Sequence, residues 1–464
     1  MDPRDVRLPA PMADRLADRA RALLPLGTAL EDRHEPTDDE RAALAELAER
    51  LRNTYPYPDP RYAGQMLKPP AAVAWAAYAT TMLLNPNNHA LDGGPATAEM
   101  EREAVAQLAE MFALPQHLGH LTASGTIANL EALWVARELH PDRAIVSGEN
   151  AHYTHARVSA VIGALHETVA QDARGRIDLD ALAARLRAGG VGTVVATPGT
   201  TGIGALDDVA AIADLCTEHG ARLHVDAAYG GFFALIADAP ETGAAADGEP
   251  TVAAAPFAAI ARADSVVVDP HKHGLQPYGC GCVLFADPGV GRLYAHDSPY
   301  TYFTSDDLHL GEISLECSRA GAAAAALWTT LRALPLTRAG LGRHLAAARA
   351  AAQQTAAALA DDPRTALLLE PETDIVCVLP ADDSAAAISA AAERAFATLA
   401  ADGWHVAKLR VGTDWLRRTH PHIAPDAPAV TVLRCCLLKQ EHAGVAPALA
   451  QALAAHLDAA RVPA

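Results

Sequence analysis

Four groups of side chains that could do chemistry stand next to apolar, strand-like or helical runs. An ammonium group beside a buried strand is costly, because burial disfavours the charged form of lysine. A neutral lysine amine, in contrast, can form a Schiff base with a carbonyl compound. Taken alone, the lysine is explained equally well by a strand whose polar end meets solvent. The four groups are Lys272 after "VVVDPH", Asp226 at the end of "RLHVD", His152 after "AIVSGENA", and Ser124, Gly125 and Thr126 before "IANLEALWVARELH".

Each group alone could have a structural role, but the four groups together are better explained as the binding site of one ligand. Ser124–Thr126 offers backbone N–H groups and two hydroxyls at a helix start, which can bind an anion, although a serine there is often only an N-cap. Asp226 could hold a protonated ring nitrogen, and the small Ala228 would leave room for a flat ring. Thr201 in "ATPGTTG" adds a hydroxyl. With an aldehyde-binding lysine, this set indicates pyridoxal 5'-phosphate (PLP).

The elements that must position these side chains alternate along the middle of the chain. Short apolar runs separated by amphipathic helices predict a mostly parallel sheet covered on both faces. A ligand is then expected beyond the carboxyl ends of the strands. Between a helix at 99–112 and a helix at 126–140 we expect a glycine turn. The strands are expected at 144–148, 191–199, 222–228, 265–270 and 281–287.

The regions on either side differ in pattern. Residues 1 to about 55 are predicted to be helical, and a Pro-, Gly- and Asn-rich stretch with a helix at 71–84 follows. The last part contains four apolar strands with helices between them. We therefore predict an N-terminal helical arm with substrate-side loops at 1–95, a large cofactor-binding domain at 96–336, and a small α+β domain at 337–464.

Composition excludes several classes of partner and site. The 464 residues carry 37 Lys and Arg against 56 Asp and Glu, a net charge of −19, so nucleic acid and anionic membranes are not expected to bind. The longest apolar run, 71–84, is too short to span a bilayer. The N-terminus lacks the pattern of a secretory signal, and the seven cysteines lie mostly in apolar runs, so we expect a cytoplasmic protein. No metal site is expected, since Cys280-Gly281-Cys282 has no second ligand pair.

The same residues make the sequence similar to a known family. From about Arg61 to the C-terminus it resembles the group II PLP-dependent amino acid decarboxylases, and it is most similar to the bacterial tyrosine decarboxylases. The resemblance implies an α/β protein of PLP fold type I, whose large domain has a mostly parallel seven-stranded sheet. It also implies a homodimer that converts an L-amino acid, with aromatic ones favoured, to an amine and CO2. The motifs that carry it are "NPNNHALDGGPATAEME", "GHLTASGTIANLEALWVARE", "HVDAAYGG", "DPHKHGLQPYG", "SRAGAAAAALW" and "VTVLR".

The resemblance also implies a role for each candidate residue. Lys272 would form the Schiff base with the cofactor, and Asp226 would bind the ring nitrogen and keep it protonated. His152 would stack on one face of the ring, opposite Ala228, and Thr201 would bond near the cofactor's phenolic oxygen or the substrate carboxylate. The phosphate would be held by Ser124, Gly125, Thr126 and His271.

Three positions depart from the family pattern or align poorly. The family protonates Cα, after CO2 has left, with a tyrosine on a loop that follows the lysine, and Tyr300 and Tyr302 are the candidates. We favour Tyr300 because Pro299 would fix its direction, with His152 as the next candidate donor. Tyr278 is too near the lysine strand for a mobile lid, and Tyr294 lies in a predicted helix. His273 follows the lysine where relatives more often carry a bulky apolar residue, which could alter the pocket wall or change nothing.

Arg434, in the terminal strand "VTVLR", could bind the substrate carboxylate or form a structural ion pair. Two other functions stay open beside amino acid decarboxylation. One is a diverged PLP enzyme that couples decarboxylation to oxidative deamination or to carbon–carbon bond formation. The other is a PLP-binding regulatory protein, which the absence of any DNA-binding motif or basic patch disfavours. Pocket residues are expected from the 61–95 loops and from a partner subunit, and the sequence does not identify the amino acid.

Overall fold

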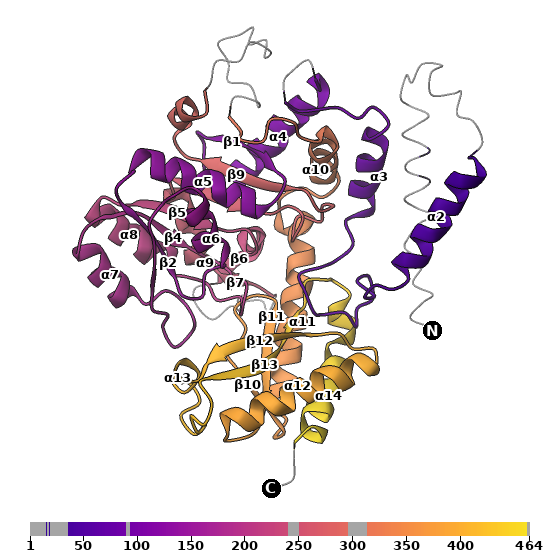
Figure 1. Cartoon of the computed structure of the whole chain (residues 1–464), viewed down its shortest axis with the longest axis vertical. Helices are drawn as coiled ribbons and strands as arrows, with labels where there is room; N and C mark the ends of the chain where they lie inside the picture. The colour runs from indigo at the N-terminus through magenta and orange to yellow at the C-terminus, as the bar shows by residue number, and fades with distance from the viewer. Residues whose placement is uncertain are drawn as a thin grey trace.

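The computed structural model describes Arg15, Asp18 and residues 36–89, 93–239, 250–295 and 313–461. Figure 1 shows a large α/β part built on one sheet and, below it, a smaller part in orange and yellow built on a second sheet. Strands and helices alternate along the large part as the sequence pattern predicts, although two of the strands were not predicted. The predicted domain boundaries, 1–95, 96–336 and 337–464, stay a prediction.

The large sheet has seven strands in the order β1-β9-β8-β5-β4-β2-β3. Only β9 runs against its neighbours β1 and β8, and the other described pairs are parallel. The mostly parallel seven-stranded sheet is therefore confirmed. Its strands are β1 (Leu118–Thr122), β2 (Ala144–Gly148), β3 (His166–Val169), β4 (Val191–Ala196), β5 (Arg222–Asp226), β8 (Ser265–Val268) and β9 (Gly281–Phe285).

Burial on both faces explains why the central strands are continuously apolar. Every residue of β2, β4, β8 and β9 is buried. Along β8, Val267 packs into the core beneath α5, whereas Val266 and Val268 pack into the core on the other face. Most helices of the large part add an apolar stripe to one of these cores. The helices of the large part are α3 (Ala72–Thr81), α4 (Pro95–Met111), α5 (Gly125–Leu139), α6 (Thr154–Val161), α7 (Leu179–Arg187), α8 (Val209–His219), α9 (Ala254–Ala258) and α10 (Gly321–Ala333).

Two strands of the sheet were not expected from the sequence. β1 occupies the segment where we expected a glycine turn, because Gly119 and His120 break its apolar run. β3 is the edge strand, and three of its four residues are partly or fully exposed, so it carries no continuous apolar signal. The short remaining elements of this part are η3 (Gly231–Ile236), β6 (Ala237–Ala239), β7 (Val252–Ala253), η4 (Ala259–Arg262) and η5 (Pro288–Leu293).

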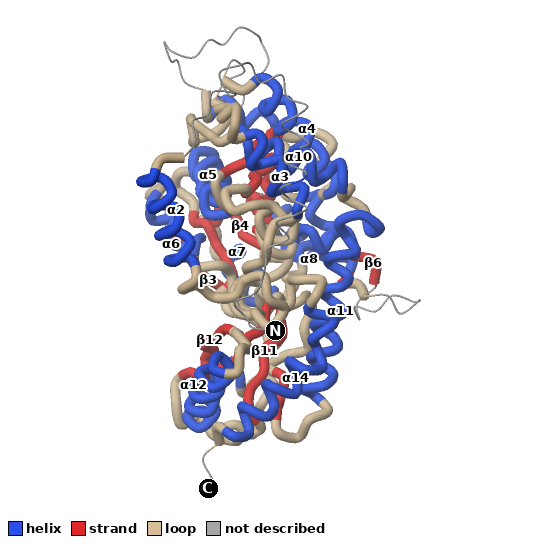
Figure 2. Tube along the Cα trace, turned by 90° about the vertical axis from the view of Figure 1, so that its right-hand side faces the viewer, coloured by secondary structure: helices blue, strands red, loops and turns tan. Residues whose placement is uncertain are grey.

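The small part is a four-stranded antiparallel sheet, β10-β11-β13-β12, with helices packed on it. After the π-turn η7 (Arg338–Gly342), α11 (Arg343–Ala360) runs from the large part down into the small one (Figures 1 and 2). Leu345 of this helix packs into the large core, and Leu359 packs into the small one. The other elements are β10 (Thr365–Leu367), β11 (Ile375–Pro380), α12 (Ala385–Ala401), β12 (Ala407–Gly412), α13 (Thr413–Leu416), β13 (Ala429–Cys436) and α14 (His442–Ala459).

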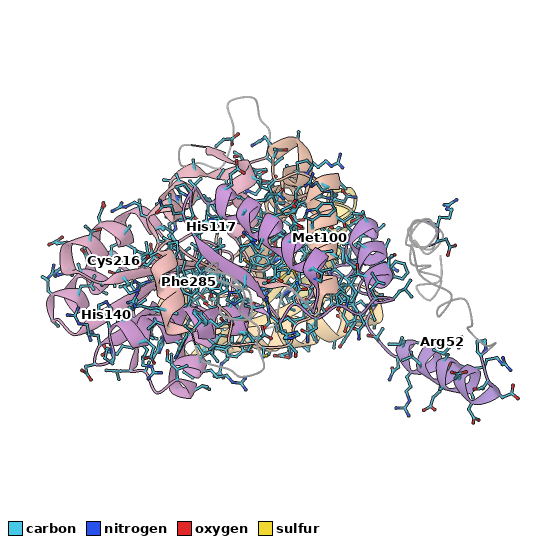
Figure 3. The ribbon with its side chains drawn as sticks, turned by 90° about the horizontal axis from the view of Figure 1, so that it is seen from above. Arg52, Met100, His117, His140, Cys216 and Phe285 are labelled. Carbon is cyan, nitrogen blue, oxygen red and sulfur yellow. The ribbon has the colours of Figure 1, made fainter. Side chains whose placement is uncertain are left out.

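Helix α2 (Asp38–Leu51) stands apart from both sheets (Figures 1 and 3). Thr37 and Glu40 form a capping box that starts it, yet none of its residues is buried. Leu44, Leu47 and Leu51 are 62%, 50% and 60% exposed. Their spacing puts them on one side of the helix, which therefore presents an uncovered apolar face. Among the described helices, none is long and apolar enough to cross a membrane.

Candidate active site

A pocket of about 180 Å³ opens beyond the carboxyl ends of the large sheet's parallel strands. Five strands deliver residues to it, since the carboxyl ends of parallel strands meet at one edge of a sheet. All the cofactor-binding residues predicted from the sequence line this pocket. The lining residues are Ser124, Gly125, Thr126, Asn129, His152, Thr154, Thr197, Gly199, Thr201, Asp226, Ala228, Tyr229, Asp269, His271 and Lys272.

The start of α5 forms one wall of the pocket. Ser124 is the N-cap, and its Oγ accepts a hydrogen bond from the N–H of Ile127 at 3.4 Å. A Cβ on Gly125 would overlap the carboxylate of Asp269, so the wall can approach the lysine loop only with glycine here. The N–H groups at the start of this 15-residue helix give the wall the polarity that an anion needs.

Lys272 lies beside a carboxylate that the sequence argument did not use. Its Nζ is 3.0 Å from Asp269 Oδ2, and Asp269 itself is buried. His271 Nε2 lies 3.5 Å from the same oxygen. Burial lowers the pKa of His271, and the nearby Lys272 lowers it further, so His271 is neutral at pH 7. The lysine is thus held at the strand end by Asp269, three residues before it in the chain.

Asp226 is buried at the end of β5 and is bound on both oxygens. His155 Nε2 lies 2.9 Å from Oδ2, and the N–H of Ala228 donates to Oδ1 at 3.1 Å. Burial alone would raise the pKa of Asp226, but the bond and charge of His155 and the charge of Lys272 outweigh it and hold this pKa below its ordinary value. Asp226 is therefore an ionised carboxylate inside the protein, which suits a partner that carries a positive charge.

Three further polar residues lie behind Asp226 and His155: His224, Asn129 and Ser265. His224, on β5, is completely enclosed, and its Nε2 and Nδ1 lie 2.8 Å from Asn129 Oδ1 and Ser265 Oγ. Burial lowers the pKa of His224 to about 3, so it stays neutral. These two contacts of His224 fix the position of β5 against α5 and β8 behind the pocket.

His152 and Thr201 enter the pocket from the loops after β2 and β4. Thr154 bonds His152 Nδ1 through both its hydroxyl (2.7 Å) and its N–H (3.3 Å). Because Nδ1 accepts the N–H, the imidazole carries its proton on Nε2 when neutral. Burial lowers the pKa of His152, which favours that neutral form. His152 and Ala228 line the same pocket, as expected for residues on the two faces of one ring.

Two predicted residues are not among the pocket's lining. Arg434 lies on β13 of the small part, 7% exposed, and interacts electrostatically with Tyr229, which does line the pocket. No carboxylate of the described residues lies within 4 Å of it, so it is not the structural ion pair that we considered. Tyr300, like Tyr302, lies outside the described residues.

Sequence reasoning missed several residues that line the pocket or lie directly behind it. Asp269 was within reach, because it stands in the quoted "DPHK" motif three residues before the lysine. Tyr229 stands in "HVDAAYGG", a motif from which the sequence analysis used only Asp226 and Ala228. His155 gave no usable signal, since only the three-dimensional structure brings the first turns of α6 against the end of β5. His273 is buried, with its ring 4.8 Å and 5.0 Å from those of Tyr229 and Phe233.

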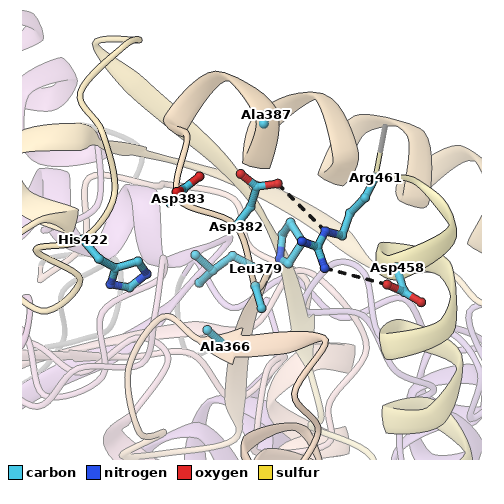
Figure 4. A pocket seen from close by; sticks show the side chains of 10 residues that line it. Ala366, Leu379, Asp382, Asp383, Ala387, His422, Asp458 and Arg461 are labelled. Carbon is cyan, nitrogen blue, oxygen red and sulfur yellow. Dashed lines mark ion pairs between the residues drawn. The ribbon is translucent and has the colours of Figure 1, made fainter. Parts of the chain in front are cut away.

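A larger hollow of about 900 Å³ lies on the small part (Figure 4). Its polar side chains are Asp382, Asp383, His422, Asp458 and Arg461, and Arg461 lies 3.9 Å from both Asp382 and Asp458. Among its described lining residues there is no lysine, serine or cysteine. The strand-end pocket, and not this hollow, therefore holds the groups that could do covalent chemistry.

The strand-end residues fit PLP on four counts. Lys272 can take an aldehyde, the start of α5 can take a phosphate, and ionised Asp226 can take a protonated ring nitrogen. In addition, Asp269 Oδ1 and His271 Nδ1 are buried without a hydrogen-bond partner among the described residues. Polar atoms enclosed in this way are expected to meet a polar ligand.

Residues 59–379 match the family model described as the pyridoxal-dependent decarboxylase conserved domain. The chain belongs to the pyridoxal-dependent decarboxylase family. Its cofactor is accordingly PLP, and the match covers every predicted site residue except Arg434. The resemblance to group II decarboxylases, including the bacterial tyrosine decarboxylases, is confirmed.

The curated relatives are named as decarboxylases of more than one amino acid. The chain is 31% identical to the L-tyrosine decarboxylase of Enterococcus faecium over 67% of its own length and 66% of that enzyme's. It is 34% identical to the probable L-aspartate decarboxylase of Halobacterium salinarum over 52% of its length and 62% of that protein's. The chain thus spans less than two thirds of the length of these two relatives.

Solved structures share the fold at low identity. Mouse CSAD in its apo form matches with a TM-score of 0.77 and 21% identity, covering 97% of this chain and 98% of that one. Oryza sativa TDC with PLP and tryptamine matches with a TM-score of 0.76 and 19% identity, covering 96% of each chain. A sphingosine-1-phosphate lyase of Burkholderia pseudomallei matches with a TM-score of 0.72 and 21% identity, covering 93% and 92%. The fold is PLP fold type I, as expected, and it carries more than one reaction.

Proposed function

We propose that the protein is a PLP-dependent decarboxylase that converts an L-amino acid to the corresponding amine and CO2. The observation that carries the proposal is the position of Lys272, at the carboxyl edge of the sheet in one pocket with the α5 N-terminus and the Asp226–His155 pair. When bound, PLP supplies an aldehyde for covalent attachment and a protonated ring that accepts the electron pair left on Cα as CO2 departs.

Each residue of the pocket has a task in this proposal. Lys272 would hold PLP covalently through the aldehyde carbon of the cofactor. Asp226, kept ionised by His155, holds the proton on the ring nitrogen and so preserves the ring's positive charge. His152 and Ala228 cover the two faces of the ring and exclude water from them. The phosphate is held by Ser124, Gly125, Thr126 and His271, and Thr201 bonds the phenolic oxygen or the substrate carboxylate.

Two further residues complete the proposal. We assign Arg434 to the substrate carboxylate because it is a buried cation without an ion pair among the described carboxylates. A carboxylate arriving with the substrate would supply that partner. Tyr300 is proposed to give the proton to Cα after CO2 has left, since a tyrosine hydroxyl can act as a general acid.

The substrate is proposed to be an aromatic L-amino acid, with L-aspartate as the first competitor to test. The similarity to L-tyrosine decarboxylases supports the aromatic class, and the similarity to a probable L-aspartate decarboxylase supports the acidic one. The decisive experiment incubates the purified, PLP-loaded chain with the twenty common L-amino acids and with D-tyrosine, and measures amine, CO2 and O2. We expect equal amounts of amine and CO2 from an L-amino acid without O2 uptake, and none from D-tyrosine or with the Lys272→Arg variant. Stoichiometric O2 consumption, or no CO2 from any amino acid, would overturn the proposal.

We also propose that the protein works as a homodimer in the cytoplasm. The uncovered leucine face of α2 supports the dimer. Association would be stabilised by about 25 cal/mol for each Å² of this apolar surface that a partner removes from water. All seven cysteines are free, which is the usual state in a reducing compartment.

A further inference from the structure

Three consecutive residues of the small part, Glu372, Thr373 and Asp374, contact the loops that line the active-site pocket. We call them the docking segment. Glu372 Oε2 accepts the N–H of Leu206 at 2.8 Å, and Thr373 Oγ1 donates to the carbonyl of Gly204 at 3.3 Å. The segment immediately precedes β11, so it joins the small sheet directly to the large part.

The first two contacts end on the loop that carries Thr201. The N–H groups of Gly199 and Thr200 both donate to the carbonyl of Ala205, at 3.0 Å and 2.9 Å. Ala205 lies between the two residues that the docking segment binds, Gly204 and Leu206. A Cβ on Gly204 would overlap Thr373 Oγ1, and Gly204 has a φ of +71°, so glycine is required on both counts. The docking segment therefore closes the base of the 199–206 loop.

The third contact reaches the residues beside Asp226 and Lys272. Asp374 is completely buried, and its Oδ1 accepts the hydroxyl of Tyr229 at 2.7 Å. Tyr229 lines the pocket and follows Asp226 by three residues. The other oxygen, Oδ2, lies 3.3 Å from His273 Nε2, next in the chain to Lys272. One carboxylate of the small part thus touches a neighbour of each of the two residues assigned to the cofactor.

Charged groups around Asp374 hold it in place from several elements. Arg349, on α11, donates to the carbonyls of Pro371 (2.7 Å) and Thr373 (3.0 Å). Burial raises the pKa of Asp374 to about 6, while the bond from Tyr229 and the charges of Lys68 and Arg349 lower it. Burial also lowers the pKa of His273 far below its ordinary value, so the imidazole is neutral. At neutral pH Asp374 is therefore an ionised acceptor with two fixed neighbours.

A domain contact alone does not need such groups. Burying a carboxylate costs several kcal/mol before its partners compensate, and apolar side chains of equal volume would hold two parts together at lower cost. Hydrogen bonds to a carboxylate, unlike apolar contacts, fix the direction of the donor. The arrangement thus favours a role in which the orientation of Tyr229 matters.

We propose that the docking segment positions the cofactor pocket, with Asp374 as a positioning residue that orients Tyr229 and the chain beside Asp226 and Lys272. The placement of the small part then determines how well the pocket is formed. The inference rests on the proposed function only for the identity of the ligand, since its first readout needs no ligand.

The first readout is hydrogen exchange of the cofactor-free full chain. Tyr229→Phe, which removes one oxygen, and Asp374→Ala are each expected to speed amide exchange at least tenfold in the 227–231 segment. Asp374→Asn keeps an acceptor oxygen and is expected to stay within threefold of the parent. Glu372→Ala should speed exchange in the 199–206 loop instead. The control is Thr365→Val, which removes a buried hydroxyl bond (2.7 Å to the carbonyl of Leu359) inside the small part and should change neither segment.

The second readout is the dissociation constant of PLP from the apo-protein. Tyr229→Phe and Asp374→Ala should each raise it about tenfold, the effect of losing one hydrogen bond to a charged group. The double variant should equal Asp374→Ala alone, because that substitution already removes the bond that Tyr229→Phe would remove. Unchanged exchange in both segments, or effects of the two substitutions that add in the double variant, would overturn the proposal. If the parent binds no PLP while exchange changes as expected, the proposed function fails and the positioning role stands.

Discussion

Asp226 is the residue at which the chemistry depends most on its neighbours. A buried carboxylate without partners would protonate, but His155 at 2.9 Å and the N–H of Ala228 keep it ionised. An ionised Asp226 can hold a proton on the ring nitrogen of the cofactor, and the ring can then withdraw electrons from Cα. In the proposed reaction, His155 would therefore act through Asp226, without contacting the substrate.

The substitution Asp226→Asn tests this dependence. A neutral amide cannot hold the ring nitrogen protonated, so we expect decarboxylation to fall about 100-fold or more, while the apo-protein still binds PLP. The matched control is Asp208→Asn, because Asp208 caps α8 by accepting the N–H of Ala211 and asparagine can accept the same bond. In steady-state kinetics, the decarboxylation rate of this control should equal that of the parent. Parent-like turnover of Asp226→Asn would contradict the role.

The Tyr300→Phe variant tests the proton donor. Without the hydroxyl we expect CO2 release to continue but the yield of amine per CO2 to fall below that of the parent. Product analysis by chromatography, with CO2 measured in the same vial, gives this ratio. Tyr302→Phe is the comparison, with one tyrosine removed two positions further along. A fall in the ratio for Tyr302→Phe alone would move the assignment to Tyr302.

At the residue scale, the sequence predicted groups that belong to motifs and missed those that only the fold assembles. Lys272, Asp226 and Ser124–Thr126 stand at strand or helix ends, where local pattern marks a loop at the sheet edge. His155 lies inside a helix and meets Asp226 from 71 positions away in the chain. No local pattern reports a contact of that separation.

At the element scale, continuous burial separates the predicted strands from the missed ones. β4 and β8 are buried along their whole length and read as apolar runs, whereas β3 lies at the edge and β1 contains Gly119 and His120. The small sheet was predicted because each of its strands lies in or beside a run that carries several branched apolar residues. Helix α2 was predicted from its periodicity. Its isolation was not predicted, because an apolar face in the sequence normally indicates a partner in the same chain, and the described residues provide none.

Charging the exposed face of α2 tests its proposed place at a subunit interface. The double variant Leu44→Lys/Leu47→Lys keeps good helix formers but adds two charges to the leucine face. We expect light scattering to give a dimer for the parent and a larger monomer fraction for the variant. The control Glu46→Lys alters a neighbouring position of the same helix outside that face. A parent that is active as a monomer would contradict the proposal.

At the scale of the whole molecule, buried neutral histidines link stability to pH. Burial lowers the pKa of His224 to about 3 and that of His442 to about 4, whereas the unfolded chain takes up protons near 6.5. Below pH 6.5 the unfolded state therefore binds more protons than the folded one, and the free energy of unfolding falls as the pH falls.

Between pH 7 and pH 5 each of these two histidines should lower the free energy of unfolding by about 2 kcal/mol. His442 lies outside the pocket, where its Nδ1 accepts the N–H of Lys439 at 3.2 Å. Urea unfolding of His442→Gln should show a pH dependence that is smaller than the parent's by about that amount. His422→Gln, at an exposed position, should keep the parent's dependence. Equal slopes for the parent and His442→Gln would contradict the linkage.

The central claim is that Lys272 holds the cofactor, and borohydride reduction of the PLP-loaded protein tests it most directly. The chain has only four lysines, Lys68, Lys272, Lys408 and Lys439, so peptide mass mapping can assign the reduced linkage without ambiguity. Lys68 is a genuine competitor, because burial lowers its pKa to about 8 and leaves part of it as the nucleophilic amine at neutral pH. We predict one pyridoxyl group per chain, on the peptide that contains Lys272, and its loss in Lys272→Arg. Labelling of Lys68 or Lys439 in place of Lys272, or no labelling at all, would contradict the account.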